Sequence, residues 1–584
     1  MDKAAGKKEF FENERQRLLR ITATLKNDRA PFDPHWADIA SLTFPRRVRF
    51  TETERNKSNA AYWGKILNGR ATLAARTMRS GMMSGLTSPA RAWRRITTED
   101  PDLAKFGPAK QWLQALNDRM QAFNRKSNFY KVAPTLHGDV GTFATGAIGC
   151  FPDEVTPFRY YDYPVGSYWL GCNHRGVVDM FLREFQMTVR QVVMEFGDPT
   201  QPERTKWDQF SPFVKDSFEK GDYEKTVTVS QWIGYNPNYD ARQLHPRFKR
   251  YTSFYYEQGA RVTPGQQTDA GLETRNVFLR QSGYDLFPIL APRWDVTGED
   301  TYGTSCPGME MLGDCKELQT LTRKKSKGLD KQLDPPLAGP PSLRNQKVSL
   351  LSGDITYDDA REGRAGLRPI HETKFSHGDV REDLNVLESR INEYFYVDLF
   401  QMLRQMEGVQ PRNEKELAMR QEEKLLELGP VVERIQDEFL NPNTDLEYHY
   451  LDQLGLLPPM PPDLQGKRLQ VDHISMMAQA QKLVGVAGTE RFLAFVGNMT
   501  PVYPEVRFKV SPFVAVDRYA DMMGVDTDLV VESEVAQAKV DAEIQAQAKA
   551  SQAQMLGNTA AAAKQLSETD TSTDNMLTRL LAGS

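Results

Sequence analysis

Two amphipathic helical segments, one on each side of a proline- and glycine-rich excursion, organise the middle of this chain. The first is predicted over residues 309–333 and ends at Asp334-Pro335-Pro336, because proline lacks an amide hydrogen and disfavours helix in the residue before it. The second is predicted to begin near Asp379, where apolar residues recur in steps of three and four. These positions are Leu384, Leu387, Ile391, Phe395, Leu399, Met402 and Met406. We therefore expect two long helices that hold a polar module between them.

A short loop and a third helix follow this pair. Residues 408–413 contain a glycine and a proline, which keep the loop out of both neighbouring helices. The third helix is predicted over Glu414–Leu440, and Gly429-Pro430 in its middle predicts a kink. A proline-rich linker is expected at 457–462.

Strand patterns after Gly149 predict a β-meander within an otherwise helical chain. Thr188 and Gln191 have the spacing of a helix-capping box, and Gly197 closes the short helix that they begin. The strand candidates are Tyr168–Gly171, Val177–Met187, Thr226–Tyr235, Phe248–Glu257 and Asn276–Ser282. The predicted fold class is therefore α+β.

The N-terminal region is predicted to be mainly helical, over residues 9–26, 60–83 and 108–124. Between the first two helices, residues 32–50 are expected to be irregular, with Trp36 and Phe44 as apolar anchors. The same stretch holds the basic run Arg46-Arg47-Val48-Arg49, which we interpret as a solvated surface. An extended piece is expected to begin at Trp93-Arg94-Arg95-Ile96.

The C-terminal region is predicted to contain helices at 472–496, 517–524 and 532–555. The last is rich in alanine, glutamine and lysine but has few large apolar residues, so it has little to bury alone and needs neighbouring copies to be stable. Residues 558–575 are polar and are expected to be flexible, before a final helical turn or two at 576–581.

Length and composition indicate a soluble globular protein with two to four subdomains, because 584 residues exceed one hydrophobic core. The net charge of −4 argues against a protein that wraps nucleic acid tightly, but it allows one through which a duplex passes. The four cysteines lie singly and are expected to be reduced. We find neither a signal peptide nor an apolar run of about 18 residues that would span a membrane.

Signatures of catalysis are absent from the sequence: it has no phosphate-binding loop, dinucleotide fingerprint, zinc-protease motif or nucleophile elbow. Cys172 and His174 have no second ligand pair, so an ordinary turn is expected there rather than a metal site. Acidic pairs at 153–154 and 358–359 have no companion motif. We therefore predict no enzymatic activity, no cofactor and no metal.

Four segments resemble the portal proteins, or head-to-tail connectors, of short-tailed bacteriophages. They are Gly81–Ile96 (GMMSGLTSPARAWRRI), Tyr161–Gly197 with its YPVGSYW and GVVDMFLREFQMTVRQVVMEFG stretches, Tyr302–Leu337 with YGTSCPGMEMLGDCKELQ and DPPL, and Asn413–Leu440. The similarity extends over nearly the whole chain to about Met555, and the order and spacing of the segments are more specific than any one of them.

The resemblance implies a ring of twelve copies with wing, stem, clip and crown regions. Mapped onto this chain, the wing is 1–308 with 405–520, the stem is 309–333 with 379–404, the clip is 334–378 and the crown is 521–584. Twelve helices packed about 8–10 Å apart leave a bore of about 28 Å, wider than a DNA duplex of about 20 Å. A loose fit in a mildly acidic ring limits the backbone grip that would stall a moving duplex.

The resemblance also implies functional residues and partners. The DNA-channel residues would be Arg323, Lys324, Lys325, Lys327 and Lys331 at the end of the first stem helix, and Val409, Gln410 and Arg412 in the loop that forms the narrowest ring. The partner-binding residues of the clip would be Leu350, Asp354, Tyr357, Arg361, Arg364 and Leu367. The partners implied are the packaging ATPase (terminase), a tail adaptor, the major capsid protein, scaffolding or internal core proteins, and double-stranded DNA in transit.

The expected location is the head–tail vertex of the virion, after assembly in the host cytoplasm and without a membrane. Two alternatives stay open at this point. One is a ring-shaped head–tail adaptor that takes no part in packaging. The other is a virion-associated hydrolase, which rests only on scattered carboxylates.

Overall fold

A computed structural model describes the chain except for residues 1, 52–63, 101–106, 198–206, 259–277, 334–336, 339–367, 370–376, 406–426, 475–491, 502, 504, 506–508, 524–532 and 568–584. The chain divides into two compact units, Met1–Ala478 and Gln479–Ser584. The described residues contain both helices and sheets, as the predicted α+β class requires.

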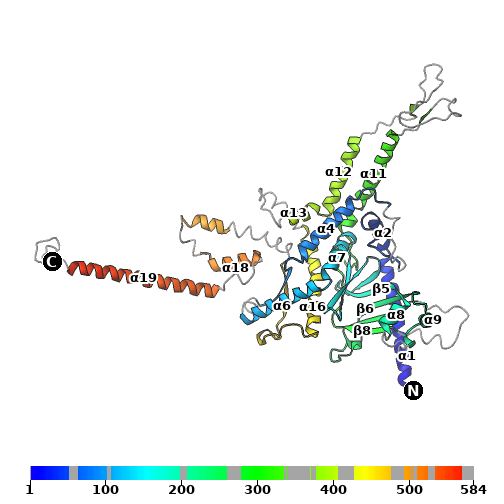
Figure 1. Ribbon diagram of the computed structural model, residues 1–584, viewed down its shortest axis with the longest axis horizontal. Helices are drawn as coiled ribbons and strands as arrows, with labels where there is room; N and C mark the ends of the chain where they lie inside the picture. The colour runs from blue at the N-terminus through cyan, green and yellow to red at the C-terminus, as the bar shows by residue number, and fades with distance from the viewer. Residues whose placement is uncertain are drawn as a thin grey trace, which may run out of the picture. The chain divides into compact units, whose positions relative to one another are not determined.

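A five-stranded antiparallel sheet forms one centre of the first unit (Figure 1). Its strands follow chain order: β4 (Tyr168–Cys172), β5 (Val178–Thr188), β6 (Thr226–Tyr235), β7 (Tyr251–Glu257) and β8 (Arg280–Tyr284). The predicted meander is confirmed, although β8 lies later than the predicted Asn276–Ser282. One face of the sheet buries Leu182, Trp232 and Phe254 against Leu18 and Leu25 of α1 (Asp2–Arg29).

The capping box at the end of β5 forms as the sequence predicts. The Thr188 side chain accepts a hydrogen bond from the Gln191 amide, and Gln191 returns one to the Thr188 amide, which starts α8 (Val189–Phe196). The apolar face of α8 then packs with Val214 of α9 (Pro212–Glu219) and Val229 of β6.

A second sheet of three strands was not predicted. Its order is β3 (Phe158–Tyr163), β2 (Ala147–Pro152) and β9 (Ile289–Leu290). The first four residues of β2 are all buried, so the strand lacks the alternation of apolar and polar residues that marks a half-exposed strand. Its third strand, β9, has only two residues, which are too few to show a strand pattern in the sequence.

Helices cover these sheets, and two of them differ from the sequence prediction. Residues expected to be irregular form α2 (Phe32–Leu42), which buries Trp36 and Ile39; Pro34 lies in its first turn, where a missing amide hydrogen is tolerated. The helix predicted from residue 60 begins only at Arg70, as α4 (Arg70–Leu86). The other helices of this region are α6 (Gly107–Lys126) and α7 (Phe129–Phe143).

A helical hairpin projects from the first unit, as Figure 1 shows. It consists of α11 (Leu312–Leu333), preceded by the short α10 (Pro307–Glu310), and of α12 (His377–Tyr394). The excursion between the two helices is closed by β10 (Leu337–Ala338) and β11 (Arg368–Pro369), which pair in antiparallel register.

The second helix of the hairpin is not continuous, which corrects the prediction of one long helix. After α12 the chain turns at Tyr396, which has a positive φ of 51°, and continues as α13 (Val397–Gln405). The break lets Phe400 of α13 pack on α4 at Gly81, where an added Cβ would lie 2.2 Å from the Phe400 ring. Phe395 and Leu399, which suggested one helical stripe, are both buried, but Phe395 lies in the turn and Leu399 in α13.

The third predicted helix lies partly outside the described residues and ends later than predicted. It is described as α15 (Gly429–Ile435), the π-helical turn η7 (Gln436–Leu440) and α16 (Asn441–Gln453). The predicted end at Leu440 is wrong, because Pro442 occupies the first turn of α16 and does not stop the chain. At the predicted kink, Pro430 lies at the start of α15.

The helix predicted over 472–496 does not begin at residue 472, and its residues 475–491 lie outside the described part of the chain. Leu469–His473 forms the strand β12, which pairs with β1 (Arg94–Thr98), the extended piece predicted near Trp93. The two strands are far apart in sequence, so local periodicity carries no sign of the pairing. Residues 492–499 are helical. Three short 3₁₀ turns complete the first unit: η3 (Trp207–Gln209), η4 (Pro246–Phe248) and η8 (Pro462–Leu464).

The second unit contains α18 (Pro512–Met523) and α19 (Ser533–Ser567). Both exceed the predicted helices, and α19 takes in part of the polar segment that was expected to be flexible. Val540, Ile544 and Met555 of α19 are exposed, which agrees with the thin apolar stripe seen in the sequence.

Candidate functional site

The exposed end of α11 carries the basic residues that the sequence singled out. Arg323, Lys324, Lys327 and Lys331 are exposed, and Lys325 is half-buried. The other predicted channel residues, Val409, Gln410 and Arg412, lie outside the described residues, as do the clip residues Leu350, Asp354, Tyr357, Arg361, Arg364 and Leu367. The structure therefore describes the helices and short strands that flank these segments, but not the segments themselves.

The buried side chain of Gln319 fastens the base of the hairpin to two residues just before α4. Its amide oxygen accepts hydrogen bonds from the backbone amides of Leu67 and Asn68 at 2.8 and 2.9 Å, and its nitrogen donates to the Asn68 carbonyl at 2.8 Å. Asn68 in turn donates to Glu388 of α12 at 2.9 Å. Both helices of the hairpin are thus tied to the few residues that precede α4.

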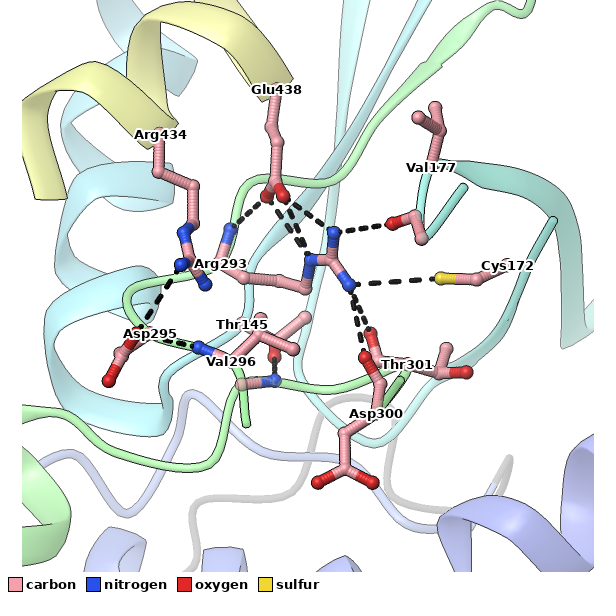
Figure 2. Close-up of polar contacts among 12 residues, drawn as sticks. Thr145, Cys172, Val177, Arg293, Asp295, Val296, Asp300, Thr301, Arg434 and Glu438 are labelled. Carbon is pink, nitrogen blue, oxygen red and sulfur yellow. Dashed lines mark hydrogen bonds and ion pairs between the residues drawn. The ribbon is translucent and has the colours of Figure 1, made fainter. Parts of the chain in front are cut away.

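Figure 2 shows a second polar centre, in which Arg293 holds the π-helical turn η7. The Arg293 guanidinium and backbone amide both donate to the carboxylate of Glu438, at distances from 2.5 to 3.2 Å. The same guanidinium donates to the carbonyls of Gly176 at 2.7 Å and Asp300 at 3.1 Å. Arg293 is buried, so one cation joins the β4–β5 turn, the loop around residue 300 and the helix.

The Glu438 partner of Arg293 lies in a π-helical turn. A π turn adds one residue to an α-helix, and such turns recur at functional sites. Here the turn lies between α15 and α16. Arg293 and Glu438 consequently fix the middle of the helical run 429–453.

Downstream of η7, a buried network fixes α16 to β1, of the β1–β12 pair, and to β3, of the three-stranded sheet. Glu447 pairs with Arg94 of β1 and accepts hydrogen bonds from Tyr160 of β3 at 2.6 Å and from Asn443 at 2.7 Å. Arg94 also donates to Thr444 at 2.8 Å. The Glu447 side chain is fully buried, and a buried charge of this kind is tolerated only with such partners.

The basic run near residue 47 is only partly the solvated surface that we expected. Arg46 and Arg49 are exposed, but the Arg47 guanidinium donates to Asp139 at 2.6 Å and to Asp162 at 2.7 Å. Burial raises the pKa of Asp139 to about 6, and the charge of Arg47 opposes that rise. Arg47 thereby joins the segment after α2 to α7 and β3, a role that a charge run in a sequence does not reveal.

The part of the chain that the structure describes contains no group of three or more His, Cys, Asp or Glu side chains arranged to hold a metal ion. His174 lies in the β4–β5 turn, as expected. Cys172 lies beside Arg293, and burial raises its pKa. All four cysteines are free of disulfides. None of the described helices is long and apolar enough to cross a membrane.

Comparison with known proteins decides the family. Residues 15–531 match the family described as bacteriophage head to tail connecting protein. The chain belongs to this family of head-to-tail connecting proteins. The connector is 40% identical over 570 residues to the portal protein of Salmonella phage epsilon15, and the alignment covers 97% of this chain and 98% of that protein. It is 35% identical over 569 residues to a probable portal protein of Bordetella phage BPP-1, with 97% and 98% covered.

Membership of the family gives the connector a structural role at the junction of head and tail, in agreement with the prediction that it is not an enzyme. Sequence reasoning found the basic end of α11 but missed the residues that support it, namely Gln319, Arg293, Glu438, Arg94 and Glu447. Arg293 and Glu438 are 145 residues apart, so no local pattern joins them.

Proposed function

We propose that this connector acts as a portal protein, a ring of twelve copies at one capsid vertex that passes double-stranded DNA during packaging and ejection and joins head to tail. The observation that carries the proposal is the match of nearly the full chain to a portal protein, over 98% of that protein's length. The projecting hairpin of α11 and α12 adds support, since helices of this kind placed side by side enclose a bore of about 28 Å.

Within this ring, the end of α11 and residues 408–413 form the channel wall. Arg323, Lys324, Lys325, Lys327 and Lys331 contact passing phosphates weakly, and Val409, Gln410 and Arg412 form the constriction. Phosphate contacts of this type position a duplex without reading its sequence. The sequence shows no phosphate-binding loop, so an external motor drives the movement.

The module between α11 and α12 docks the packaging ATPase and later the tail adaptor. It is supported at its neck by the paired strands β10 and β11, and loops on a rigid support often carry binding functions. In this proposal the wing is 1–308 with 405–520, the stem 309–333 with 379–404, the clip 334–378 and the crown 521–584. The ring lies at the head–tail vertex and contacts capsid and scaffolding or internal core proteins.

A deletion of Leu350–Leu367 tests the proposal. Rings with a through-channel should still form, as seen by electron microscopy of the purified protein, but DNA packaging should be abolished. Normal packaging by the deletion variant would favour an adaptor that serves only to join head and tail. An Arg412→Glu variant should assemble normally and lose packaged DNA; full retention of the genome would remove Arg412 from the channel.

A further inference from the structure

The joint between α12 and α13, at residues 395–397, has no local cause in the sequence. Residues 380–405 contain neither glycine nor proline, the residues at which helices usually break sharply. Apolar positions continue across the joint at helical spacing: Leu384, Leu387, Ile391, Phe395, Leu399 and Met402. Taken alone, this segment favours one straight helix.

Tyr396 makes the break with a backbone conformation that is unfavourable for tyrosine. Its φ of 51° lies in the left-handed region, which a bulky side chain rarely adopts and which glycine adopts freely. The Tyr396 amide still donates to the Glu393 carbonyl at 3.0 Å, as in the last turn of a helix. The position is therefore a helix C-terminus that holds tyrosine where glycine is usual.

Packing against neighbouring helices offsets the strain of this bent form. Val397 and Phe400 lie off the apolar stripe of a straight helix, yet both are buried. Figure 1 shows α13 beside α4, and Phe400 packs there on Gly81. The bent form is thus kept by contacts with other parts of the fold rather than by its own sequence.

The joint also lies close to the point where the described chain resumes after residue 426. Burial, and then the charges of Glu427 and Glu310, raise the pKa of Tyr396 to about 12, so both carboxylates lie near its hydroxyl. At its other end α13 stops at Gln405, the last described residue before 406–426. The break therefore sets the direction in which α13 enters that segment, and Tyr396 lies near the residue at which the segment ends.

We propose that Tyr396 is the hinge of a two-state device, in which α12 and α13 exchange between the bent form of this structure and one continuous helix. Straightening removes the left-handed residue and restores helical hydrogen bonds across the joint. It also withdraws Phe400 from Gly81 and exposes Val397. Backbone strain and burial thus oppose each other, which is the balance that a switch between two packings of one sequence needs.

The consequence of the device rests on the proposed function. In the proposed ring the hairpin carries the docking module, and α13 leads into the residues proposed to form the constriction. Exchange at Tyr396 redirects α13 relative to the hairpin and so moves the support of those residues. The two-state joint itself is a property of one copy and needs neither a ring nor DNA.

Spin-label distances in the full-length chain test for the two forms. Labels at Asn385→Cys and Gln401→Cys, both exposed positions, are about 24 Å apart in a continuous helix with a rise of about 1.5 Å per residue, and closer in the bent form. An excess of unlabelled chain restricts the signal to pairs within one copy, and protein without the added cysteines gives the background. The wild type should show mainly the shorter distance. Gly81→Ala, which displaces Phe400, should raise the population at the longer distance severalfold.

Glycine at the hinge supplies the decisive variant. Tyr396→Gly relieves the bent form and weakens the continuous helix, so in the Gly81→Ala background it should lower the ratio of the longer to the shorter distance by about tenfold. The matched control is Glu393→Gly, at an exposed position that is helical in both forms, which should leave this ratio unchanged. Phe400→Leu gives a second route to the straight form if Gly81→Ala fails to fold by circular dichroism.

The outcomes separate the hinge from a fixed bend. Appearance of the longer distance in Gly81→Ala or Phe400→Leu, and its loss when Tyr396→Gly is added, would support the device. A single short distance in all of these variants would overturn it, as would an equal effect of Tyr396→Gly and Glu393→Gly. Neither result bears on DNA passage, which fails separately if wild-type rings lack a through-channel or do not support packaging.

Discussion

Replacement of Arg293 by methionine should loosen the π-helical turn while leaving the sheets intact. Methionine keeps much of the apolar volume of arginine but removes all of its donors. The Glu438 carboxylate would lose the guanidinium, and the carbonyls of Gly176 and Asp300 would lose their hydrogen bonds at 2.7 and 3.1 Å. The expected result is local opening of η7 and α15 before the sheets unfold.

The magnitude follows from burial. The Arg293 side chain is 6% exposed and that of Glu438 is 23% exposed, so the carboxylate regains part of its hydration but the inner carbonyls do not. An unsatisfied buried group costs about 1–3 kcal/mol, and breaking a buried pair costs about 3–5 kcal/mol. We expect a loss of about 3–5 kcal/mol in local opening free energy for Arg293→Met. Glu438→Gln keeps the acceptor and should lose about half as much.

Hydrogen exchange read by mass spectrometry provides the assay, because it reports the opening free energy of individual segments. Peptides that cover 429–453 should exchange faster in the Arg293→Met variant, and peptides from β5 and β6 should not. The control is Asp295→Asn, which removes the partly exposed contact between Asp295 and Arg434 at 3.4 Å and should cost no more than about 1 kcal/mol. Equal exchange in 429–453 for Arg293→Met and wild type would refute the role given to Arg293.

Three further predictions concern other parts of the chain. Burial lowers the pKa of His137 from 6.5 to about 4, so the unfolded chain binds a proton at a higher pH than the folded chain and the free energy of unfolding decreases as pH falls through this window. Between pH 6.5 and 4 the wild type should lose about 3 kcal/mol more of this free energy than a His137→Asn variant, measured by thermal unfolding. Gly81→Ala should destabilise the protein by about 1–3 kcal/mol, because the added Cβ would clash with Phe400. Gly69→Ala is the control, since its added Cβ meets no atom within 4 Å and should be neutral. Equal thermal midpoints of the two variants would contradict the role given to Gly81. A peptide of residues 532–555 should be largely unfolded by circular dichroism in dilute buffer, and a stable isolated helix would show that α19 does not depend on neighbouring copies.

Local patterns predicted the elements whose information is local. The stripe of Leu384, Leu387 and Ile391 gave a helix, and the spacing of Thr188 and Gln191 gave a capping box. Both depend on residues a few positions apart. The family and the basic end of α11 could also be predicted, because the order of similar segments and a run of like charges can be read directly from the sequence.

Elements that depend on distant partners were missed. The strand β12 was not predicted, because its partner β1 lies far away in sequence. The strand β2 was missed because burial on both faces removes the alternation of apolar and polar residues. The break at Tyr396 needs a left-handed backbone that tertiary packing selects. Arg47 reads as one more surface cation until α7 and β3 bring two aspartates to it.

The paired strands β10 and β11 have a consequence for how such connectors diversify. Leu337 faces Pro369 and Ala338 faces Arg368, so the chain leaves and re-enters the hairpin at neighbouring points. The separation of those points does not depend on what lies between them, and each doubling of a closed loop costs only about 0.6 kcal/mol. A neck of this kind lets the intervening sequence be lengthened, shortened or exchanged while the helices on either side of it keep their register.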